Sequence, residues 1–183
     1  VCGYPGLDQA LYALRDTLRR RPGVPQSETA DALLTLAALC NLAGRAVQDA
    51  EFKGRWDEAE FQRYVRAELR RHPLIGADLD EHAHAAGGIT DLSLRGMPIE
   101  LKAVDTLISS VDQSEPFLAQ TASYAVAKSK RTAILCVLDS SEKKTASVPP
   151  ETLLDIRTHA QGAVSVCVLV IQGNVARPRA LSR

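Results

Sequence analysis

Three charged residues near the middle of the chain have the types and spacing to bind a divalent cation and act on a phosphate ester. Asp91 lies in the segment ITDLSL, and Glu100 and Lys102 lie two residues apart in IELKAV. The strand period of two puts Glu100 and Lys102 on one face, while the apolar residues between them point into the core. A turn at Arg95–Pro98 makes the two segments hairpin neighbours, so Asp91 can approach Glu100 across the sheet.

Two carboxylates beside one ammonium are costly to group without a metal ion. Hard cations such as Mg²⁺ or Mn²⁺ prefer oxygen ligands, and Asp91, Glu100 and the backbone carbonyl of Leu101 supply a partial octahedron. A bound metal lowers the pKa of its water and polarises a phosphate, while Lys102 orients the nucleophile or stabilises the developing charge. The pattern therefore predicts metal-dependent phosphodiester hydrolysis without a covalent intermediate.

The first half of the chain has the apolar spacing of helices. Residues 7–21, about 27–47 and about 57–72 each repeat apolar side chains at three and four residues. The breaker PGVP and then Pro73 end the first and third of these segments. After Pro73 the period changes, and turns at Gly87-Gly88 and Arg95–Pro98 predict a meander of three short strands that starts at Leu79 and ends with IELKAV.

The second half predicts a helix, a strand, a helix and a strand. The first helix begins near Ser114-Glu115-Pro116, and the second opens at Pro149-Pro150. The runs TAILCVLD and AVSVCVLVIQG do not alternate, which indicates strands buried on both faces, and a helix between them fits a parallel crossover. We therefore expect an α/β fold in which residues 1–53 form a helical extension and residues 54–183 form the main domain.

The spacing of the charged residues resembles the signature of a known superfamily. Gly88-x-x-Asp91, an eight-residue spacer and Glu100-Leu101-Lys102 resemble the motif of the PD-(D/E)XK nucleases, and the likeness covers about residues 57–139. It implies a restriction-endonuclease-like αβββαβ core with a mixed central sheet flanked by helices. Asp91, Glu100 and Lys102 would be its catalytic residues. Thr90 stands where the proline of the superfamily name would be.

Two further positions are implied by the same resemblance. Many members add an acidic residue from the helix before the strands, and Glu68 is the matching catalytic position here. Some members, including the helicase-associated RecB-like nucleases, carry Gln-x-x-x-Tyr on the helix after the third strand. Gln120 and Tyr124 match that pattern, and their four-residue spacing puts both on one helical face, facing the active-site edge or the substrate backbone.

The resemblance implies a Mg²⁺- or Mn²⁺-dependent deoxyribonuclease, with DNA favoured over RNA, as an effector of restriction, repair or phage defence. The 183 residues carry 22 basic and 22 acidic side chains, so net charge alone does not demand a nucleic-acid partner. We therefore expect a homodimer, or a larger complex in which another domain or subunit delivers the enzyme to DNA. The apolar surroundings of three of the four cysteines predict reduced core thiols and a cytoplasmic protein, with no membrane partner, although a disulfide stays open.

Other interpretations of the same residues remain open. A lone Glu-x-Lys on a strand is most often an exposed, salt-bridged pair. The domain could keep this fold as a catalytically inactive module that binds nucleic acid or protein, or the helical extension could be the functional part through oligomerisation. His82 and His84 could be ligands of a transition metal. We interpret them instead as two solvated residues on an edge strand.

Overall fold

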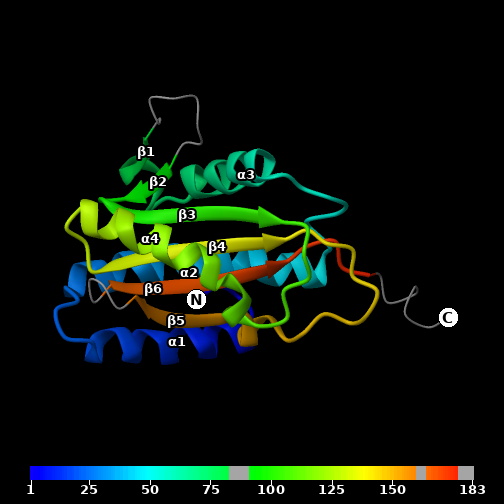
Figure 1. Cartoon of the computed structure of the whole chain (residues 1–183), viewed down its shortest axis with the longest axis horizontal. Helices are drawn as coiled ribbons and strands as arrows, with labels where there is room; N and C mark the ends of the chain where they lie inside the picture. The colour runs from blue at the N-terminus through cyan, green and yellow to red at the C-terminus, as the bar shows by residue number, and fades with distance from the viewer. Residues whose placement is uncertain (83–90, 160–163, 177–183) are drawn as a thin grey trace.

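Six strands form one mixed sheet in the computed structural model, which describes residues 1–82, 91–159 and 164–176 and only the backbone of His82 and Asp91. The strands lie in the order β1-β2-β3-β4-β6-β5 (Figure 1). Their bounds are β1 Leu79–His82, β2 Asp91–Leu94, β3 Met97–Val104, β4 Thr132–Asp139, β5 Leu154–His159 and β6 Val164–Gln172. The three strands β3, β4 and β6 run parallel, and the outer strands β1, β2 and β5 are antiparallel to their neighbours. The expected α/β class and mixed sheet flanked by helices are thus confirmed.

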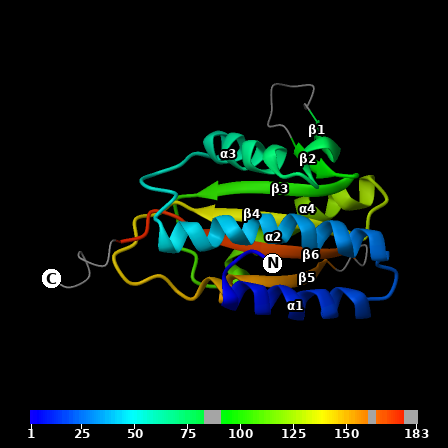
Figure 2. The ribbon, with the colours of Figure 1, turned by 180° about the vertical axis from the view of Figure 1, so that it is seen from behind.

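Helices cover both faces of this sheet. α1 (Pro5–Arg20), α2 (Gln26–Gln48) and α3 (Glu58–Arg71) lie on one face, and α4 (Glu115–Ala127) lies on the other (Figures 1 and 2). Each face has its own buried apolar cluster. The continuous runs predicted for β4 and β6 are buried along their whole length, because both faces of the central strands are covered.

One predicted element is wrong. The segment that opens at Pro149-Pro150 is a short 3₁₀ turn, η3 (Pro150–Leu153), and the chain then enters strand β5 in place of a helix. Leu154 and Ile156 are buried while Asp155 between them is exposed, which is the alternation of a strand that is buried on one face. α1 packs against η3 and β5. The N-terminal helices therefore share the core of the sheet, and the boundary near residue 53 stays a prediction.

α2 is a long apolar helix in the middle of its layer. By length and composition it is able to cross a membrane, but 56% of its most apolar stretch is buried inside the protein. Buried helices of globular cores share this composition. The helix packs against β4 and β6, so its apolar character is accounted for by its place under the sheet.

All four cysteines are free and buried, as predicted. Burial raises the pKa of the Cys167 thiol to about 12 and that of Cys136 further, and it raises the pKa of Cys40 well above its usual value. Because the thiolate is the reactive form, we expect these three cysteines to react with Ellman's reagent at pH 8 only after unfolding. Native protein and protein in guanidinium chloride are compared by absorbance. Rapid labelling of more than one thiol per native molecule would contradict the buried placement of these three.

Candidate active site

The β2–β3 hairpin joins the two strands that carry the predicted acidic residues. Its two-residue turn, Arg95-Gly96, has positive φ at both positions, which suits a tight hairpin. Leu92 pairs with Ile99, and this register, extended by one residue, puts Asp91 opposite Glu100. The side chain of Asp91 lies outside the described part of the structure. The predicted hairpin between the two segments is present, and the approach of Asp91 to Glu100 stays a prediction.

β3 continues beyond its described pairing with β2. Within the described residues, the pairing of β2 with β3 ends at Ile99, and β3 runs on to Val104. Glu100 and Lys102 lie beside Leu135 and Val137 in the register with β4, on the face that α4 covers. Since no described strand covers this edge, a long side chain can reach around it toward α3 on the other face.

Lys102 is held between two carboxylates. Its Nζ lies 2.8 Å from Oε1 of Glu100 and 3.4 Å from Oε1 of Glu58, the first residue of α3. The side chains of Lys102 and Glu100 are 14% and 6% exposed. Burial by itself lowers the pKa of the Lys102 ammonium, but the hydrogen bonds and charges of Glu100 and Glu58 raise it above the usual value. The ammonium is therefore a fixed positive charge at neutral pH.

Glu58 is a member of this site that sequence reasoning missed. A capping box fixes the start of α3, because Asp57 accepts from the backbone N–H of Glu60 while the Glu60 carboxylate accepts from that of Asp57. Glu58 and Gln62 then lie four residues apart on one side of the helix, where the Gln62 amide donates to Glu58. The pattern Asp57-x-x-Glu60 was the available signal for this placement.

The oxygens beside Lys102 are of the kind that hard divalent cations prefer. Glu58, Glu100 and the Leu101 carbonyl are oxygen donors, and two carboxylates with one ammonium leave a formal charge of one negative unit. Among the described side chains, which do not include that of Asp91, no three His, Cys, Asp or Glu residues are grouped closely enough to hold a metal ion. A complete ligand set thus needs the Leu101 carbonyl, Asp91 or both.

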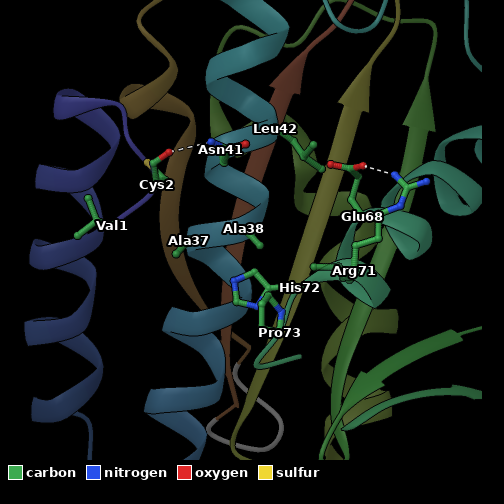
Figure 3. Close-up of a pocket in the computed structure, with 11 residues that line it drawn as sticks. Val1, Cys2, Ala37, Ala38, Asn41, Leu42, Glu68, Arg71, His72 and Pro73 are labelled. Carbon is green, nitrogen blue, oxygen red and sulfur yellow. Dashed lines mark hydrogen bonds and ion pairs between the residues drawn. The ribbon is translucent and has the colours of Figure 1, made fainter. Parts of the chain in front are cut away.

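The structure does not bring Glu68 to Lys102. Glu68 lies ten residues after Glu58 on the same helix, or about 15 Å along its axis at 1.5 Å per residue. Its carboxylate forms ion pairs with Arg45 and Arg71 at 2.8 and 3.0 Å, and it lines a groove between α2 and α3 (Figure 3). In this arrangement, Glu58 is the acidic residue of α3 that contacts the lysine.

The remaining predicted residues lie on α4, which covers the same face as Glu100. Gln120 is exposed and donates to the Tyr124 hydroxyl at 2.9 Å, so the two side chains share one side of the helix. On the α3 side, a depression of about 420 Å³ adjoins Glu58 and reaches Asp105, just after the end of β3. This depression lies on the α3 face of the sheet, whereas Gln120 and Tyr124 lie on α4, on the opposite face.

No family model, curated protein or solved structure matches this chain. The chemistry available to the site is therefore inferred from its own residues. Buried Glu100, its paired Lys102 and the oxygens beside them form an acidic centre with one fixed cation. Such a centre can bind a divalent metal ion and an anionic group together.

Proposed function

We propose that this protein is a metal-dependent nuclease with a restriction-endonuclease-like PD-(D/E)XK domain, and that its substrate is DNA. The observation that carries the proposal is the buried Glu100 paired with Lys102 on β3. An extension of the β2–β3 register by one residue would put Asp91 opposite Glu100. The order of one helix, three strands, one helix and one strand over residues 58–139 supports it as well.

Each residue of the site has a chemical role in this proposal. Glu58, Glu100, Asp91 and the Leu101 carbonyl would hold Mg²⁺ or Mn²⁺. The bound metal supplies an activated water and polarises the scissile phosphate. The ammonium of Lys102 would stabilise the negative charge that develops on the phosphate or orient the nucleophile. Gln120 and Tyr124 would contact the backbone of the substrate.

The test is whether DNA cleavage depends on both the cation and Asp91. Purified protein is incubated with supercoiled plasmid and with single-stranded DNA in Mg²⁺, in Mn²⁺ and in excess EDTA. We expect cleavage in either cation, none in EDTA, and none by Asp91→Ala that melts at the wild-type temperature. Cleavage that persists in Asp91→Ala would mean contamination or another site. Binding of DNA without cleavage would favour the inactive binding module.

A further inference from the structure

Gln62 contacts two of the oxygens that the proposed function assigns to the metal ion. Its Nε2 lies 3.4 Å from the Leu101 carbonyl oxygen and 3.5 Å from Oε1 of Glu58. The same Glu58 oxygen also accepts from Nζ of Lys102. Two nitrogen donors, on Gln62 and Lys102, thus contact oxygens that a bound cation would also have to contact.

A hydrogen-bond donor and a metal ion compete for the same oxygen lone pairs. The carbonyl oxygen of Leu101 lies on β3, so its position is fixed by the backbone of the sheet. The Gln62 amide is on a rotatable side chain, which is half-buried on α3. When a cation binds these oxygens, the amide of Gln62 therefore moves and the strand stays in place.

We propose that the carboxamide of Gln62 regulates cation binding at this site. In the metal-free protein its N–H groups make long hydrogen bonds to Glu58 and the Leu101 carbonyl, and a cation that binds these oxygens displaces the amide. The inference rests on the proposed metal-dependent function. It makes Gln62 a positioning residue that sets the cation concentration at which the site fills.

Removing the amide should tighten cation binding. Methionine has a similar length and cannot donate, so Gln62→Met is expected to lower the Kd for Mn²⁺ about 3- to 10-fold, the equivalent of one net hydrogen bond. Gln62→Glu also removes the donor and adds a carboxylate oxygen, so its Kd should fall on the order of 10-fold or more. Gln62→Met should also melt at a slightly lower temperature without metal, because it has lost contacts to Glu58 and Leu101.

The experiment measures Mn²⁺ binding directly, without DNA. Free Mn²⁺ is followed by its electron paramagnetic resonance signal during titration of wild type, Gln62→Met and Gln62→Glu. Gln9→Met is the matched control, since Gln9 is exposed on α1 and belongs to no part of the site. Thermal melting in EDTA confirms that each variant is folded.

The outcomes separate this inference from the proposed function. Tighter Mn²⁺ binding together with a lower metal-free melting temperature supports regulation by Gln62, because a purely structural role would lower both affinity and stability. If wild type binds Mn²⁺ and Gln62→Met binds it equally or more weakly, the inference is overturned and the nuclease proposal stands. If wild type does not bind Mn²⁺, both are overturned.

Discussion

Replacing Lys102 with methionine is expected to lower the rate of metal-dependent cleavage by about 100- to 1,000-fold, the usual effect of removing one group that stabilises a developing oxyanion. Binding of Mn²⁺ should persist, because Glu58 and Glu100 lose a competing ammonium and keep all their oxygens. For the same variant, single-turnover cleavage should therefore be slow, while Mn²⁺ titration should show that the cation still binds. The control is Lys53→Met, which changes an exposed lysine outside the site.

The direction of the Lys102 pKa shift determines how this side chain contributes to the stability of the metal-free wild-type protein at each pH. Folding raises the pKa of Lys102 above its ordinary value of 10.5, so the folded protein binds this proton more tightly than the unfolded chain does. The resulting stabilisation is complete below about pH 10.5 and is lost as the pH rises through the higher folded value. Between pH 6 and 9 the free energy of unfolding measured in EDTA should therefore show no contribution from ionisation of Lys102. A wild-type cleavage rate in Lys102→Met would contradict its assigned role.

The fold was predictable where one physical pattern dominated a segment. β4 and β6 are unbroken apolar runs because helices cover both of their faces, and α1 and α3 repeat apolar residues at helical spacing. The prediction for the β5 segment failed because two prolines resemble the start of a helix, whereas the alternation of buried and exposed residues after them spans only Leu154 to Ile156. A strand that short has little periodic signal, and its pairing with β6 is a long-range property.

The candidate site shows the same division between local and distant information. The pairing of Glu100 with Lys102 follows from two residues on one strand, so sequence alone predicts their common face. Glu58 joins them from 44 positions away through the packing of α3 against β3. The resemblance pointed to Glu68 on this helix, whereas the acid that contacts Lys102 is Glu58, because the sequence does not give which turn of the helix packs beside the lysine.

Replacing Asp139 with asparagine is expected to reduce the free energy of unfolding by about 3–5 kcal/mol, because it removes one partner of a buried ion pair. Asp139 is 0% and Lys143 4% exposed, and their charged atoms lie 2.8 Å apart at the end of β4. The carboxylate also accepts from the backbone N–H groups of Ile108 and Ser141. An amide has one acceptor oxygen for these donors, so its nitrogen must face at least one of them.

The matched control for Asp139→Asn is Asp112→Asn, because Asp112 also forms an ion pair but is 79% exposed. Its loss should cost between about 0 and 1 kcal/mol, as for other surface pairs. Urea unfolding followed by circular dichroism compares the two variants and Lys143→Met.

Equal small losses at both aspartates would mean that water reaches Asp139. A large loss at Asp139 alone would mean that its carboxylate stabilises the contact between the segment after β3 and the end of β4, through the hydrogen bond from Ile108. This contact also bears on the candidate site, because the same segment directly follows β3, which carries Glu100 and Lys102.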